Sequence, residues 1–268
     1  MYKYFISLVM LGLFVIPVHL YAGITIEGLL THERVAQPGE RFRGVIAIRN
    51  TGERAAEVKV YRTDYSFAAD GRNDYGPPGR LVRSNADWLH LAREQITVAP
   101  HSLVNLNYEM EVADDETLNG TYWSMVMVEP VSARESTLEP REGEARAQLT
   151  PVMRYGIQMV THIGDSGSRE LAFSNPQLVK AKSRRLFRLD VENTGERWLR
   201  PQLWLELFDH NGRPVGKFGG EQKRIYPATS VRYQTDLSEV PAGRYRMLIL
   251  ADGGGNDLFG SHFDLRIE

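Results

Sequence analysis

The chain has 268 residues, no cysteine, and a formal net charge of −2 at neutral pH. The lack of cysteine excludes disulfides, thiolate metal sites and cysteine nucleophiles. A charge so close to zero argues against nucleic acid or an anionic membrane surface as the partner.

The N-terminal segment has the order of features of a secretory signal peptide. Lys3 precedes an apolar run from Phe5 to Val18, and Leu20-Tyr21-Ala22 ends in a small residue. The run is short for a membrane span, and an uncleaved N-terminal anchor is the alternative. We therefore predict a signal peptide over residues 1–22, export to the periplasm, and no integral membrane segment after cleavage.

A pentapeptide, Asn-Thr-Gly-Glu-Arg, occurs at residues 50–54 and again at residues 193–197. Each copy lies between two stretches that alternate polar and apolar residues, so we interpret each as the turn of a β-hairpin. A strand led by proline and a strand opened by Gly-x-Tyr then follow in both copies. They begin near Pro100 and Gly120 in the first copy, and near Pro227 and Gly243 in the second.

This repeated pattern defines the fold class. Short strands at regular spacing with turn residues between them, and no helical period, are typical of a β-sandwich. Two copies of one pattern indicate two such domains. We predict an all-β chain of two tandem immunoglobulin-like β-sandwiches, with the N-terminal domain over residues 23–162 and the C-terminal domain over residues 163–268.

The first copy reads, in chain order, IRNTGE, WLHL, ITVAPHSLVNLNYEMEV and GTYWSMVMVEP. This order resembles the N-terminal domain of the periplasmic chaperones of the chaperone–usher pilus pathway. It also resembles the peptidoglycan-binding domain of WxL-associated surface proteins. The first resemblance implies a non-enzymatic periplasmic protein, without a cofactor, that binds a secreted β-rich subunit during assembly of a pilus or another surface structure.

In the pilus chaperones, the last strand of the first domain is lent to an incomplete subunit. Backbone hydrogen bonds give affinity in such strand addition, and alternate side chains fill pockets. The matching segment here is residues 151–160, so the resemblance implies partner contacts by Val152, Met153, Arg154, Tyr155, Ile157 and Met159. The alternative is a plain core strand with one apolar face, because Arg154 and Gln158 make the second face polar.

Those chaperones also hold the terminal carboxylate of the subunit with an arginine and a lysine. Arg34, Arg41 and Arg154 are arginines near the matching strands, and no lysine occupies the matching region. An arginine binds a carboxylate through two parallel hydrogen bonds. The residues leave the anchor unassigned.

Motifs that carry chemistry are scarce. Gly164-Asp-Ser-Gly167 matches the turn around a serine-protease nucleophile, but no histidine and aspartate follow in a suitable order. The histidines have no spacing suited to a metal, so we predict neither a catalytic site nor a metal site. An alternative function is an envelope module that binds peptidoglycan or another glycan through exposed aromatic rings. We instead place the tryptophans in the sandwich cores.

Overall fold

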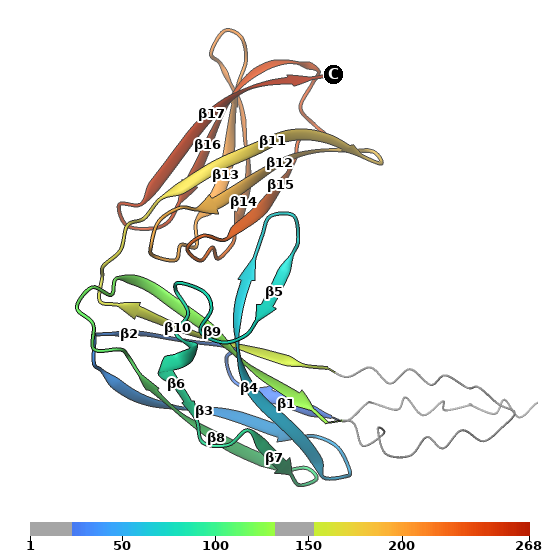
Figure 1. The fold of residues 1–268 in the computed structure, drawn as a ribbon. Helices are drawn as coiled ribbons and strands as arrows, with labels where there is room; N and C mark the ends of the chain where they lie inside the picture. Colours follow the sequence, from blue (N-terminus) through green and yellow to red (C-terminus); the bar gives the residue numbers. More distant parts are fainter. Residues whose placement is uncertain (1–22, 132–152) are drawn as a thin grey trace, which may run out of the picture.

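The computed structural model describes residues 23–131 and 153–268, and their strands form two β-sandwiches in succession (Figure 1). The 3₁₀ turn η1 (Ala86–Trp88) is the one helical element of these residues. No helix in this described part is long and apolar enough to cross a membrane. The predicted all-β fold is confirmed.

The N-terminal domain packs two sheets face to face. One sheet has the strand order β1 (Ile24–Glu27), β3 (Arg41–Asn50), β8 (Leu103–Glu111) and β6 (Leu89–Leu91). The other has the order β2 (Thr31–Ala36), β10 (Tyr155–Ile163), β9 (Gly120–Pro130), β4 (Ala56–Phe67) and β5 (Asn73–Gly76), with β7 (Gln95–Val98) also paired to β4.

The C-terminal domain repeats this design. Its smaller sheet has the order β11 (Leu171–Ala181), β12 (Arg184–Asn193) and β15 (Ser230–Asp236). The larger has the order β14 (Pro214–Gln222), β13 (Gln202–Phe208), β16 (Gly243–Asp252) and β17 (Leu258–Ile267). Residues 164–170 join the two domains, and they include the Gly-Asp-Ser-Gly motif.

Alternation along the strands builds each core. Val58 and Val60 of β4 point inward, as do Ile46 and Ile48 of β3 in the opposite sheet, and all four are buried. Successive side chains of a strand point to opposite faces, so every second residue enters the core. Burial of each such side chain stabilises the fold by about 1.5–3 kcal/mol.

We had predicted that the two Asn-Thr-Gly-Glu-Arg segments are hairpin turns, and this prediction is wrong. Each connects a strand of one sheet to a strand of the opposite sheet, β3 to β4 and β12 to β13. The alternating pattern of a strand is the same whether the next strand pairs with it or faces it across the core. The pattern therefore located the turns but not the sheets that they connect.

A buried asparagine holds each crossing. Asn50 Nδ2 donates to the carbonyl oxygens of Arg54 (2.7 Å) and Val98 (3.0 Å), and its Oδ1 accepts from Gly52 N at 2.9 Å. Asn193 makes the corresponding bonds. They join it to Arg197 O (2.8 Å), Ile225 O (3.0 Å) and Gly195 N (2.9 Å).

The first strand of the N-terminal domain changes sheets along its length. β1 pairs with β3, and β2 then pairs in parallel with β10. Gly28 lies at the change, with a φ of 94°, a conformation that favours glycine. This switch determines which part of β10 is covered on its outer edge.

Candidate functional site: the edge of strand β10 and the interdomain cleft

Strand β10 has one fully paired edge and one divided edge. It pairs with β9 along its whole length, from Tyr155 opposite Val128 to Ile163 opposite Gly120. On the other edge β2 pairs only with residues 158–163. The division is sharp, because Gln158 N donates to Leu30 O at 2.9 Å and the chain before Leu30 leaves for the other sheet. Among the described residues, no strand pairs with this edge of residues 155–157.

The backbone geometry identifies which groups face the open edge. Gln158 N–H points toward β2. Since backbone directions alternate along a strand, the N–H groups of Gly156 and Arg154 lie on the same side as that of Gln158. The open edge therefore offers peptide donors and acceptors to an added strand.

The six residues expected to contact a partner have different environments. Ile157 and Met159 are 0% and 1% exposed in the core, and Tyr155 packs against that core. Met153 is 66% exposed, and Arg154 is exposed and lies 3.6 Å from Glu129 Oε2. Val152 lies outside the described residues. Tyr155, Ile157 and Met159 thus serve the core of this domain, and Met153 and Arg154 face solvent.

An apolar groove runs beside the open edge on the outer face of the sheet. Its volume is about 810 Å³, and its lining comes from β4, β5, β9, β10 and the two prolines that follow β5. The apolar lining residues are Tyr61, Tyr75, Pro77, Pro78, Met125 and Met127. Gly156 keeps the groove open over β10, since a Cβ there would lie 3.0 Å from Met125 Sδ.

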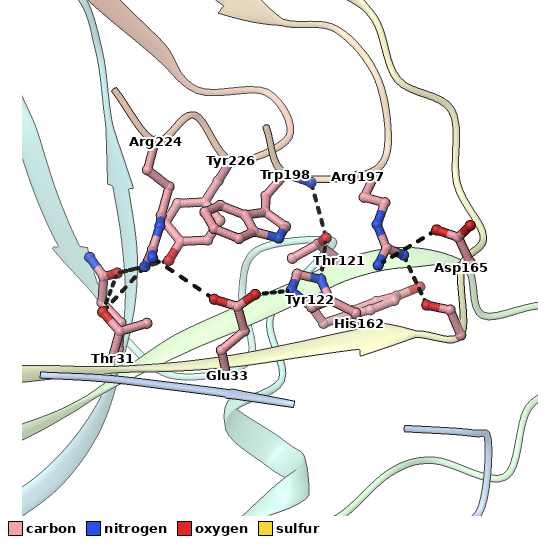
Figure 2. Close-up of polar contacts among 12 residues, drawn as sticks. Thr31, Glu33, Thr121, Tyr122, His162, Asp165, Arg197, Trp198, Arg224 and Tyr226 are labelled. Atoms are coloured by element: carbon pink, nitrogen blue, oxygen red, sulfur yellow. Dashed lines mark hydrogen bonds and ion pairs between the residues drawn. The ribbon is translucent and has the colours of Figure 1, made fainter. Parts of the chain in front are cut away.

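Farther along, β10 meets the C-terminal domain (Figure 2). Gln158 lines the cleft between the domains there, together with Arg224 and Tyr226. Gln158 Oε1 accepts from the Tyr226 hydroxyl at 2.8 Å and from Arg224 Nη1 at 3.2 Å. Arg224 Nη1 also lies 3.2 Å from Thr31 Oγ1, and its other terminal nitrogen lies 3.9 Å from Glu33 Oε2. The C-terminal domain thus places a guanidinium against the divided edge.

Aromatic rings form the buried part of the contact between the domains. Tyr226 stacks on Trp123 with 4.8 Å between ring centroids, and Trp198 stacks on Tyr226 at 6.3 Å. Val160 of β10 belongs to the same cluster. Burial raises the pKa of the Tyr226 hydroxyl to about 12. Where the C-terminal domain covers the outer face of β10, its aromatic rings therefore pack on Val160, between the polar side chains of Gln158 and His162.

Arg34 and Arg41, two of the arginines among which the sequence left the anchor unassigned, lie away from the cleft. Arg34 pairs with Glu40 at 3.4 Å, and Arg41 pairs with Glu111, both on the surface of the N-terminal domain. The arginine in the cleft is Arg224, which the sequence analysis missed. It belongs to the second repeat, and no local pattern indicates that this residue reaches the first domain.

The tryptophans do not form an exposed row. Trp123 is buried beneath the C-terminal domain, and Trp88, Trp198 and Trp204 are half-buried. Lys217 Nζ lies 3.9 Å from the centre of the Trp204 ring and covers it. These rings lend no geometric support to a glycan-binding platform.

Comparisons with known proteins agree with this architecture at the level of the fold. No family model and no curated protein matches the chain. A chain of the chaperone–tip adhesin complex of CFA/I fimbriae biogenesis matches with a TM-score of 0.50 at 10% identity, over 90% of this chain and 98% of that one. The likeness is one of fold. The chain shares its two-domain sandwich fold with fimbrial chaperones.

Two other solved structures have lower scores. The class 5 fimbriae chaperone CfaA matches with a TM-score of 0.49 at 13% identity, over 90% of this chain and 98% of that one. The CsuC–CsuE chaperone–tip subunit complex of Csu pili from Acinetobacter baumannii matches with a TM-score of 0.43 at 11% identity, over 79% and 90%.

Proposed function

We propose that this protein is a non-enzymatic, periplasmic chaperone-like protein that binds a secreted β-rich subunit by strand addition during assembly of a pilus or another surface structure. The observation that carries the proposal is the divided edge of β10. β2 covers that edge from Gln158 onward and leaves residues 155–157 without a strand partner among the described residues. An uncovered strand edge is a ready template for another chain.

The groove beside this edge offers apolar contacts that would add to the binding free energy of the backbone hydrogen bonds. Each backbone hydrogen bond of an added strand contributes only about 0.5–1.5 kcal/mol net. Apolar side chains of the added strand would pack over Gly156 against Met125, Met127 and Tyr75. Met153, which is 66% exposed, is a further apolar side chain at the start of the edge. The backbone hydrogen bonds between β10 and the added strand would supply affinity, and the fit of its side chains in the groove would select the partner.

Arg224 is the proposed contact for the end of the added strand. A strand that pairs with the open edge must stop where Leu30 begins to cover β10, and Gln158 marks that position. Arg224 hydrogen-bonds to Gln158 there and is 26% exposed. A carboxylate at the end of the partner strand would form a charge-assisted pair with this guanidinium.

The test removes one donor from the open edge without disturbing the core. Arg154→Pro deletes the N–H that faces the edge, and Arg154→Ala is the matched control, since it removes the same side chain and keeps the N–H. We expect wild type and Arg154→Ala to recover a β-rich subunit from periplasmic extract, and Arg154→Pro to recover much less. Circular dichroism would show that all three proteins are folded. Equal recovery by all three would contradict strand addition at this edge, and recovery of glycan alone would favour an envelope-binding module.

A further inference from the structure

His162 lies at the contact between the domains, and the function proposed above does not use it. It comes from β10, and its side chain is 3% exposed. Its ring stacks on the indole of Trp198 from the C-terminal domain, with 5.6 Å between centroids and 14° between planes. Figure 2 shows the ring between Glu33, Thr121 and Trp198.

Both ring nitrogens are engaged, and their partners determine the tautomer. Nε2 lies 3.0 Å from Glu33 Oε1, and an ionised carboxylate only accepts, so Nε2 carries the hydrogen. Nδ1 of the neutral ring is then an acceptor for the Thr121 hydroxyl at 2.9 Å. That hydroxyl in turn accepts from the backbone N–H of Trp198 at 3.0 Å. A single chain of hydrogen bonds thus connects Glu33 with the C-terminal domain through the neutral ring.

Protonation of the ring disrupts this chain. A hydrogen on Nδ1 would point at Thr121 Oγ1, so the hydroxyl hydrogen must leave the line between those two atoms. The new charge would also sit in a buried position, which disfavours the charged form. It would add a second cation beside Trp198, because the Arg224 guanidinium already lies 4.3 Å from the centre of that ring.

The charged groups that face the ring come from both domains. Glu33 on β2 favours the protonated form through its hydrogen bond. Arg197 and Arg224 from the C-terminal domain oppose it, and burial opposes it most. The net effect is a pKa of His162 below the usual value of 6.5. Proton uptake is therefore favoured by any state in which the domains separate and water reaches the ring.

We propose that His162 is an acid-sensitive latch that holds the C-terminal domain against β10, and that its protonation releases Trp198 and changes the angle between the domains. The latch does not depend on the proposed partner, because it acts within the isolated chain. Arg224 belongs to the C-terminal domain and bonds Gln158 of the same strand β10. Release of the latch would therefore also move Arg224 away from Gln158.

The test follows the shape of the whole protein during acidification from pH 8 to pH 4.5. We expect the radius of gyration from X-ray scattering to rise, and tryptophan emission to shift to longer wavelength, with a midpoint below pH 6.5. His162→Gln should lose this transition, because its amide still donates to Glu33 but does not titrate. His32→Gln is the matched control, since His32 is half-buried, bonds the Tyr108 hydroxyl at 2.9 Å, and also has a lowered pKa. It should keep the transition.

Survival of the transition in His162→Gln, or its loss in His32→Gln, would overturn the proposal. If His162→Gln does not fold, an NMR titration of the wild-type protein decides the question. Resonances of the His162 ring and of Trp198 that move with one midpoint support the latch, and separate midpoints contradict it.

Discussion

The indole of Trp123 lies almost parallel to the phenol ring of Tyr226, with 4.8 Å between the centroids and 13° between the planes. Trp123 belongs to β9 of the N-terminal domain, and Tyr226 belongs to the segment between β14 and β15 of the C-terminal domain. Tyr226 is fully buried. The contact between the domains therefore has a buried aromatic centre, which favours a fixed cleft over two freely moving domains.

The first prediction concerns this aromatic centre. Tyr226→Ala removes a buried ring and leaves a cavity, which typically costs about 3–5 kcal/mol. We expect calorimetry to show two separate unfolding transitions, since the domains lose their main apolar contact. Tyr226→Phe keeps the ring and loses only the bond to Gln158, so it should cost about 1 kcal/mol. A single transition in Tyr226→Ala, unchanged from wild type, would mean that the ring does not couple the domains.

The second prediction concerns alkaline pH. Burial raises the pKa of Tyr226 and of Tyr233 to about 12, above the usual value of about 10 for a tyrosine. The unfolded chain therefore releases these protons at lower pH than the folded chain. The stabilisation is complete below pH 10 and is lost as the pH rises toward 12, by about 1.4 kcal/mol per pH unit for each group. Urea denaturation between pH 9 and pH 12 measures the slope, and Tyr226→Phe should reduce it.

The third prediction tests the equivalence of the two buried asparagines. Asn50→Ala leaves the carbonyls of Arg54 and Val98 and the N–H of Gly52 without their partner, and each buried unpaired group costs about 1–3 kcal/mol. Asn193→Ala should have the same effect in the C-terminal domain. We expect each to lower the denaturation midpoint by a similar amount. Asn105→Ala, on an exposed position of β8, is the control and should change little.

The fourth prediction concerns the loop after β5. The buried carboxylate of Asp64 accepts from the backbone N–H of Gly79 (3.1 Å), Arg80 (2.7 Å) and Leu81 (2.7 Å), and from the Ser84 hydroxyl. Asp64→Ala leaves these donors unpaired, so we expect the amides of residues 79–81 to exchange hydrogen far faster. Mass spectrometry of exchange measures this change.

Asp70→Ala is the comparison for the Asp64 variant. Asp70 is exposed and pairs with Arg72 in a neighbouring turn. Its loss should leave exchange at residues 79–81 as in wild type. Exchange in Asp64→Ala no faster than in this control would show that the loop is held by other contacts.

Much of the fold was predictable because it depends on local pattern. The alternation around Val58 and Val60, and around Leu203 and Leu205, places the same side chains in the core whatever strand lies next to them. The connection after Asn50 was not predictable in this way. Whether the next strand joins the same sheet or the opposite sheet depends on contacts distant in sequence.

The candidate site shows the same division. The segment 151–160 could be recognised as a final strand, and its alternation separated Ile157 and Met159 from Gly156 and Gln158. Which part of its outer edge is covered could not be predicted. The coverage depends on the change of sheet at Gly28 and on the hydrogen bond from Gln158 N to Leu30 O. Arg224 was missed for the same reason, because it reaches β10 only through the docking of the second domain.

The sequence by itself determined an all-β chain with two repeats, two cores and a turn at each buried asparagine. These features follow from side-chain periodicity and turn chemistry, which act over a few residues. Only the tertiary structure decided which sheet each strand joins, where the edge of β10 is open, and how His162, Trp198 and Arg224 meet. Those outcomes depend on hydrogen bonds and burial between segments more than 30 residues apart, such as His162 and Glu33, and no local pattern specifies such pairs.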